Sequence, residues 1–291
     1  MIESLLATMQ EYTIEPERLI GKKYQSIKIL DAKELNFKDF KGIKIKELSA
    51  LAYKDNTLYI LGDKGSLFHF DIRLKNDKIQ SLDISNAFVL KDKYGEKLKK
   101  KHRDSEGLCF LGKNLLISFE GKPRVNLYTL SGIKIKNKKI HQDIRKIKKY
   151  RSGNKALESV AYNDTYEILT APEKPLTGLD KRQHTLYSKT KKWTLPASGS
   201  ITALEFMSEN EIMILERNLD ILNFRIVISL SSLNLKTLKY KVLAKLDSRD
   251  GWNLDNFEGL TKVDGNKYLM ISDDNDSFFQ KTLLVLFEVE D

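Results

Sequence analysis

A strand, a polar turn and a second strand recur five times along the chain, and this repeat restricts the fold more than any other feature of the sequence. The copies begin at residues 48, 104, 156, 200 and 255 with LSALAYKDNTLYILGDKG, DSEGLCFLGKNLLISFEG, ALESVAYNDTYEILTAPE, SITALEFMSENEIMILERN and DNFEGLTKVDGNKYLMISDDN. A third strand follows each copy, and a fourth follows in the longer intervals, so the unit spans roughly 44 to 57 residues, the length of a propeller blade. We therefore predict an all-β fold, a β-propeller of five four-stranded blades. A six-bladed ring is the alternative if a long connection hides a degenerate blade.

The last unit has only three strands before the chain reaches Asp291. Residues 24–30 (YQSIKIL) precede the first unit and can supply the missing strand by pairing with residues 282–289. Such pairing closes the ring and buries two sheet edges that would otherwise invite aggregation. We expect an N-terminal extension over residues 1–23 and a single propeller domain over 24–291. Only residues 3–12 and 86–98 are expected to be helix-capable.

Two columns of the repeat indicate a site. The residue that opens the first strand and the residue that closes the second are 14 or 15 positions apart in every copy, as the pairs Ser49/Asp63, Glu106/Glu120, Glu158/Glu173, Thr202/Glu216 and Glu258/Asp273. In an up-and-down blade both positions lie at the same face, so the columns should converge on one mouth of the central channel. Carboxylates gathered there repel one another by about 1 kcal/mol per pair at 4 Å in water, and by more where water is excluded. A positive group must therefore lie among them.

Two sources of that positive charge are open. Basic residues occur on the same loops, namely Lys64, Lys122, Arg124, Lys174, Arg182, Arg217 and Arg225, with His184 beside them. A hard divalent cation held by oxygen ligands, most plausibly Ca²⁺, would serve equally well. Any single acid could instead accept backbone N–H groups of the next blade and fix the ring without chemistry. Because an acid recurs in the same column of every copy, we favour a ligand or metal site for the set.

The basic excess of the whole chain is weaker evidence. Lys and Arg number 50 against 40 Asp and Glu, a net charge of +10, and much of the excess lies in residues 91–103 and 134–151. These stretches are rich in lysine and have only Tyr94 and Tyr150 nearby, whereas nucleic-acid grooves combine arginine with exposed aromatic side chains. We interpret them as solvated connections and expect no nucleic-acid partner.

Membrane insertion and thiol chemistry are not expected either. No apolar run approaches the ~18 to 20 residues that cross a bilayer, and residues 1–9 lack the basic start of a signal peptide. If the natural protein is exported, its signal lies outside this sequence. Cys109 lies inside a predicted strand and is expected to be a buried, inert thiol. We expect a monomer that acts on a small molecule.

The motifs DSEGL, SFEG, ALESVAY, TAPE, a strand ending in LER, NFEGL and ISDDN occur in an order that resembles the bacterial phytase-like propeller family, described as having esterase-like activity of phytase. The resemblance runs from about Glu47 to Val289. Lys64 stands where the family shows arginine, and Ser159 stands where it shows glycine. The resemblance implies a secreted or periplasmic β-propeller that hydrolyses phosphate or other esters.

For that activity we predict a metal-assisted mechanism with three groups of residues. The predicted Ca²⁺ ligands are Glu106, Glu158, Glu258, Asp63, Glu216 and Asp273. Glu120 or Glu173 would act as general base, while Arg217 and Lys64 stabilise charge on the phosphoryl oxygens. The predicted substrate-binding residues are Lys122, Arg124, Arg182 and His184. The competing hypothesis is a non-catalytic propeller that binds a ligand or a protein at the same mouth, with a purely structural metal.

Overall fold

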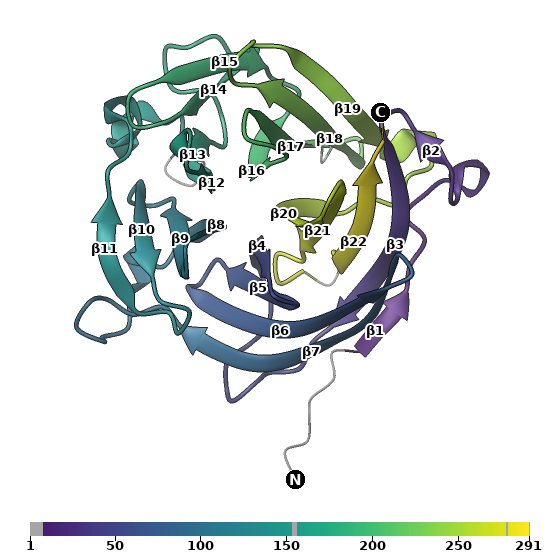
Figure 1. Ribbon diagram of the computed structural model, residues 1–291, viewed down its shortest axis with the longest axis horizontal. Coiled ribbons are helices and arrows are strands. Elements are labelled where there is room, and N and C mark those ends of the chain that lie inside the picture. Colours follow the sequence, from purple (N-terminus) through teal and green to yellow (C-terminus); the bar gives the residue numbers. More distant parts are fainter. Residues whose placement is uncertain (1–7, 153–155, 221, 278, 291) are drawn as a thin grey trace.

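The computed structural model describes residues 8–152, 156–220, 222–277 and 279–290 as a ring of five antiparallel sheets (Figure 1). From the axis outwards, blade 1 is β4 (Leu48–Lys54), β5 (Thr57–Gly62), β6 (Ser66–Lys75) and β7 (Lys78–Val89), and blade 2 is β8 (Ser105–Leu111), β9 (Asn114–Phe119), β10 (Arg124–Tyr128) and β11 (Lys134–Lys138). Blade 3 is β12 (Leu157–Asn163), β13 (Glu167–Pro172), β14 (Gln183–Tyr187) and β15 (Lys192–Pro196), and blade 4 is β16 (Ser200–Phe206), β17 (Glu211–Asp220), β18 (Arg225–Asn234) and β19 (Tyr240–Asp247). Blade 5 begins with β20 (Asn256–Asp264), β21 (Lys267–Asp273) and β22 (Thr282–Val289). The prediction of an all-β, five-bladed propeller is confirmed.

The N-terminal segment closes the ring, as predicted. Strand β3 (Ile27–Asn36) pairs antiparallel with β22, with Ile27 opposite Val289 and Leu35 opposite Thr282. The pairing strand is longer and starts later than the predicted residues 24–30. A short strand, β2 (Lys23–Tyr24), folds back on β3, and β1 (Thr8–Glu11) pairs with the outer edge of β3. Part of the expected N-terminal extension therefore joins the sheet of blade 5.

The position of a strand within its blade determines its pattern of buried and exposed residues. The innermost strands are covered on both faces, and in β4 the five residues from Leu48 to Ala52 are all buried. The outer strands alternate, because one face meets the next blade and the other meets water. In β15, for example, Trp193 and Leu195 are buried while the residues between and beside them are exposed.

The hydrophobic core is divided into slices between neighbouring blades. Leu61 of blade 1 packs in one cluster with Leu115 and Ile117 of blade 2, and all three side chains are fully buried. Leu169 of blade 3 shares another cluster with Ile214 of blade 4. Burying such a side chain stabilises the fold by about 1.5–3 kcal/mol relative to leaving it exposed. The blades therefore hold one another through these slices, and the axis is left for other side chains.

The helix expectation is wrong within the described ranges. Residues 8–11 form β1 and residues 86–89 end β7, because both segments find a strand to pair with; residues 3–7 of the first prediction lie outside the described part. The helices found in these ranges are single 3₁₀ turns: η1 (Glu17–Leu19), η2 (Lys100–His102), η3 (Gln142–Ile144), η4 (Ile147–Lys149) and η5 (Ser248–Asp250). Among the described residues no helix has the length and apolar character needed to span a membrane.

Candidate functional site

The central channel is nearly filled. The five innermost strands β4, β8, β12, β16 and β20 surround it (Figure 1), and the cavity they leave measures about 10 Å³, room for about one water molecule. Small residues allow this close approach. A Cβ atom on Gly107 would lie 2.5 Å from Ser118 Oγ and 2.8 Å from the Glu158 carbonyl oxygen. A ligand therefore has no room inside the channel.

Every innermost strand has a β-bulge at the first-column residue. The pairing register shifts between Leu48 and Ala50, Ser105 and Leu108, Leu157 and Ser159, Ile201 and Ala203, and Phe257 and Gly259, which brackets Ser49, Glu106, Glu158, Thr202 and Glu258. A bulge adds a residue to one strand and re-aims its side chain. The repeat therefore carries a structural device at the position where three blades have glutamate.

The column acids meet across the axis. Oxygen atoms of Asp63, Glu106 and Glu258, which come from blades 1, 2 and 5, all lie within 4.8 Å of one another. Two further groups meet the same limit: Asp104 with Glu106 and Glu120, and Glu120 with Glu158 and Glu173. We call these seven residues the acidic centre. Glu106 and Glu120 belong to two groups each, so the three groups form one continuous cluster.

Asp104 is a member that the sequence analysis missed. It opens the DSEGL motif, two residues before Glu106, and its Oδ2 accepts the N–H of Gly121 at 3.1 Å. Asn256 stands at the same place in NFEGL, and its Nδ2 donates to Glu258 Oε1 at 3.0 Å. The sequence does contain a pattern that points to Asp104, because a polar residue stands two positions before the glutamate in both motifs.

Burial and crowding raise the pKa of these acids. The pKa of Asp63 rises to about 7, mainly through burial and then through Glu258, and the pKa of neighbouring Asp273 rises to about 9 through burial, Glu258 and Asp63. Burial, followed by Asp63, Glu158, Glu120 and Glu258, raises the pKa of Glu106 well above its ordinary value. Burial, followed by Glu173, Glu120 and Glu258, does the same for Glu158. At neutral pH the cluster therefore binds protons or another positive charge.

Arg217 supplies one such charge. Its guanidinium donates to Glu258 and to Asn256, and its Nη2 lies 3.7 Å from Glu173 Oε1. Burial lowers the pKa of Arg217, but the carboxylates of Glu258, Glu158 and Glu173 outweigh burial and raise it. Arg217 also offsets part of the rise in the pKa of Glu258, which burial drives. One guanidinium does not balance seven carboxyl groups.

Glu216 is engaged differently from the other acids of its column. Its Oε1 accepts the N–H groups of Ser198 and Gly199 at 2.8 and 3.1 Å, and His184 Nε2 lies 3.4 Å away. His184 lies on strand β14 rather than on a mouth loop, is 1 % exposed, and its Nε2 is 2.8 Å from the carbonyl oxygen of Gly199. These contacts connect blade 3 to blade 4. They agree with the alternative that a single acid of the column accepts backbone N–H groups and fixes the ring.

The other predicted site residues are spread more widely. Asp273 Oδ1 accepts the N–H of Asn275 at 2.9 Å, and Glu120 Oε1 accepts that of Ala156 at 2.5 Å. The ammonium of Lys64 pairs with Glu47, and its side chain is 65 % exposed. Arg182 pairs with Asp180 at 2.9 Å and is 88 % exposed.

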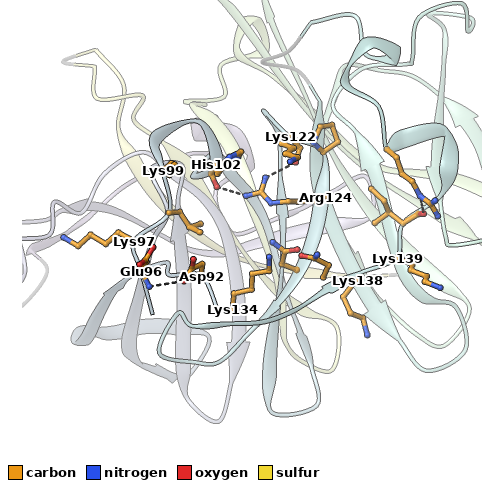
Figure 2. A pocket seen from close by; sticks show the side chains of 16 residues that line it. Asp92, Glu96, Lys97, Lys99, His102, Lys122, Arg124, Lys134, Lys138 and Lys139 are labelled. Atoms are coloured by element: carbon orange, nitrogen blue, oxygen red, sulfur yellow. Dashed lines mark hydrogen bonds between the residues drawn. The ribbon is translucent and has the colours of Figure 1, made fainter. Parts of the chain in front are cut away.

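Lys122 and Arg124 line a separate cavity, which Figure 2 shows from close by. It measures about 780 Å³ and lies between the connection from blade 1 to blade 2 and strands β10 and β11. We call it the basic pocket and define it by its lining residues: Asp92, residues 96–99, His102, residues 122–124, Asn126, Lys134, residues 137–140 and Arg145. The structure therefore separates two of the predicted substrate-binding residues from His184 and Arg182.

Comparison with protein families gives one match. The family described as "Phytase-like: Esterase-like activity of phytase" matches residues 43–276, which include all five copies of the repeat. No curated protein is found to match the chain.

Solved structures show only distant likeness. A chain in a crystal structure of the mitotic checkpoint complex is 14 % identical, with 84 % of this chain and 62 % of that chain covered and a TM-score of 0.40. This chain thus spans less than two thirds of that one. A chain in a nidogen/laminin complex is 14 % identical, with 75 % and 70 % covered and a TM-score of 0.43. The structure of U3-55K is 12 % identical, with 89 % and 83 % covered and a TM-score of 0.42.

Proposed function

This chain belongs to the phytase-like family, and we propose that it hydrolyses phosphate or other esters with a divalent cation, best matched by Ca²⁺, held in its acidic centre. The observation that carries the proposal is a chain of three groups, each of three carboxyl side chains whose oxygens lie within 4.8 Å of one another. Glu106 links the first two groups and Glu120 links the last two. Structural carboxylates placed only to fix the blades would gain nothing from such crowding.

The donor set fits a hard cation. All the donor atoms in the three groups are carboxylate oxygens, the ligands that Ca²⁺ prefers. Asp63 Oδ1 is buried and has no hydrogen-bond partner among the described residues, so one oxygen at the axis lacks a positive or donating neighbour. We propose Glu106, Glu158 and Glu258, with Asp63 and Asp273, as the ligands. Glu216 has a structural role in this proposal, because His184 and two backbone N–H groups surround its Oε1 and it belongs to none of the three groups found among the described residues.

The cation would neutralise the charge of the substrate and lower the pKa of a water molecule bound to it. The remaining residues then have defined tasks. Glu120 or Glu173 would serve as the general base for water, since both carboxyl groups lie in one group with Glu158. Arg217, which contacts Glu258 and approaches Glu173, stabilises negative charge that develops on the ester oxygens. Lys64 at the surface attracts an anionic substrate.

Access limits the substrate. Glu106, Glu120, Glu158, Glu173 and Glu258 are 3–8 % exposed, and the channel behind them holds about 10 Å³. Only the ester group itself can reach the centre, while the rest of the molecule stays at the surface of the ring. We also propose a periplasmic or extracellular location, where Ca²⁺ modules function with a Kd of about 10⁻⁴–10⁻³ M.

The test combines turnover with thermal stability. The purified protein is assayed on an aryl phosphate, an aryl acetate and inositol hexakisphosphate, with Ca²⁺ and with EDTA. We expect turnover of at least one substrate with Ca²⁺ and a lower melting temperature in EDTA. The variant Glu106→Gln/Glu258→Gln should lose both the activity and the Ca²⁺-dependent rise in melting temperature. The matched control Glu17→Gln/Glu167→Gln removes two exposed acids and should keep both.

A second function, a non-catalytic propeller with a structural metal, is favoured by the same burial of the acids. It predicts that no substrate is turned over while EDTA still lowers the melting temperature. Full Ca²⁺ stabilisation in Glu106→Gln/Glu258→Gln would contradict a metal in the acidic centre under either function.

A further inference from the structure

The basic pocket is a cavity of ligand size that the proposed hydrolysis does not use. Its volume of about 780 Å³ lies within the range of about 300–1,000 Å³ typical of small-molecule sites. One wall is the connection that includes Asp92 and His102, and the other consists of β10 and β11 (Figure 2). The pocket therefore lies between the connection from blade 1 to blade 2 and the outer strands of blade 2.

Its charge is strongly one-sided. Of the 16 lining residues, eight are Lys or Arg and two are Asp or Glu. Within the described part of the chain, none of these eight cations forms an ion pair. Asp92 offsets only part of this charge: it acts to raise the pKa of Lys134, while its Oδ1 accepts the N–H groups of Tyr94 and Glu96 at 2.9 and 3.0 Å. The cavity carries a net positive potential.

Arg124 is held rigidly at the upper end of the pocket as drawn in Figure 2. Its Nη1 and Nη2 donate to the carbonyl oxygens of Lys122 and His102 at 2.9 and 2.6 Å, and its guanidinium lies 3.8 Å from the centre of the Phe119 ring. Carbonyl oxygens and a ring fix the group but leave its positive charge without a counter-ion. A guanidinium fixed in this way is suited to an oxyanion.

Positive groups around Arg124 repel one another, and burial together with this repulsion lowers the pKa of two of its neighbours. Burial and then Arg124 lower the pKa of Lys134, and burial followed by Arg124 and Lys122 lowers that of His102. Asn126 of β10 also lines the pocket, is 1 % exposed, and its Oδ1 has no hydrogen-bond partner among the described residues. This buried oxygen is an acceptor, so a donor such as water or a hydroxyl group is needed to complete its hydrogen bond.

We propose that the basic pocket binds a compact small molecule carrying two or more phosphate groups. Eight cations line one open cavity around Arg124, which suits clustered phosphates better than a single charge. The lining contains no Phe, Tyr or Trp, so the pocket offers no surface on which a nucleic-acid base could stack. Binding here does not require the acidic centre or its metal.

The test is titration calorimetry with inorganic tripolyphosphate in a buffer containing EDTA, which prevents phosphate from bridging to Ca²⁺. We expect saturable binding to the wild-type protein that weakens as salt is added. Lys134→Gln/Lys138→Gln removes two half-buried pocket cations and should weaken binding about tenfold or more. Lys113→Gln/Lys136→Gln removes the same charge from exposed positions of the same blade, outside the pocket, and should bind as the wild type does.

Three results would overturn the proposal: no heat of binding with the wild-type protein, equal weakening in both double variants, or tighter binding of single-stranded RNA than of tripolyphosphate. Glu106→Gln/Glu258→Gln separates this proposal from the proposed hydrolysis, because it should still bind tripolyphosphate. Arg124→Lys keeps the charge but loses the paired donors, so it should bind more weakly than the wild type without loss of folded structure by circular dichroism.

Discussion

The acidic centre and the basic pocket are neighbours in blade 2, but their charged side chains differ in sign and in exposure to water. Arg124, at the start of β10, comes only four residues after Glu120, which follows β9. Glu120 and its partner acids are 3–8 % exposed, apart from the half-buried Asp63 and Asp104, whereas Lys97, Lys99 and Lys122 are exposed. Like charges are crowded in both regions, but water reaches only one of them.

The difference shows that burial, rather than net charge, decides the chemistry of each region. Solvated lysines keep their charge at little cost, because water screens their repulsion. Buried carboxylates must bind protons or pair with a cation, and Arg217 neutralises only part of their negative charge. The net charge of +10 therefore describes the surface and says little about the axis.

The largest expected effect comes from removing the guanidinium group of Arg217 at the axis. Arg217→Met leaves Glu258 and Glu173 without their guanidinium partner, so the free energy of unfolding should fall by about 3–5 kcal/mol in urea denaturation at neutral pH. Arg182→Met, which removes an 88 % exposed guanidinium, should leave it unchanged. Equal effects of the two substitutions would remove the distinction between buried and solvated charge.

A second test of the comparison uses pH. The folded-state pKa values of Asp63 and Asp273, about 7 and about 9, lie above the ~3.9 of an unfolded aspartate. The folded protein thus keeps protons that the unfolded chain has released, and this stability is complete below about pH 4 and is lost as the pH rises through 7 and 9. In EDTA the free energy of unfolding should be several kcal/mol lower at pH 9 than at pH 5.

Calcium should oppose that loss, because the cation replaces the protons. Urea denaturation at both pH values, with EDTA and with saturating Ca²⁺, measures this directly. A free energy of unfolding that rises from pH 5 to pH 9 in EDTA would show that the acids of the centre are not held protonated by burial.

The sequence predicts the ring and its acidic columns because both depend on a repeat. Equivalent residues of equivalent blades occupy equivalent places, so the positions of Glu106, Glu158 and Glu258 in one blade each predict their meeting at the axis. Closure by residues near 24–30 followed from the missing strand of the last blade. Asp104 was missed because its column is acidic in only two of the five copies of the repeat, at Glu47 and Asp104.

Features that depend on the packing of non-equivalent segments were beyond the sequence. The lysine-rich stretches 91–103 and 134–151 were interpreted separately as solvated connections, and nothing in either stretch shows that they face each other across one pocket. His184 was placed on a loop, but its strand pairs with β15 and buries it against Glu216. Such contacts arise from tertiary structure and have no period in the sequence.

Acids from the two columns of the repeat, Glu106 and Glu216, should respond differently to replacement by glutamine. Glu216→Gln weakens the acceptor for the N–H groups of Ser198 and Gly199 and removes the charge beside His184, so it should destabilise the fold by about 1–3 kcal/mol. The Ca²⁺-dependent rise in melting temperature should remain. Thermal melting of Glu216→Gln and Glu106→Gln with and without Ca²⁺ compares the two, and loss of the Ca²⁺ response in Glu216→Gln would make Glu216 a ligand after all.

The smallest effect is expected in the basic pocket. Lys134 and Lys138 are half-buried and have no ion-pair partner within the described residues, and at Lys134 the repulsion from Arg124 exceeds the attraction to Asp92, so Lys134→Gln/Lys138→Gln removes little net attraction. The free energy of unfolding measured in urea should change by no more than about 0.5 kcal/mol. A loss of several kcal/mol would mean that these lysines hold blades 1 and 2 together. The pocket would then resemble the acidic centre, where a charge cannot be removed without cost, and the contrast between solvated and buried charge would fail in blade 2.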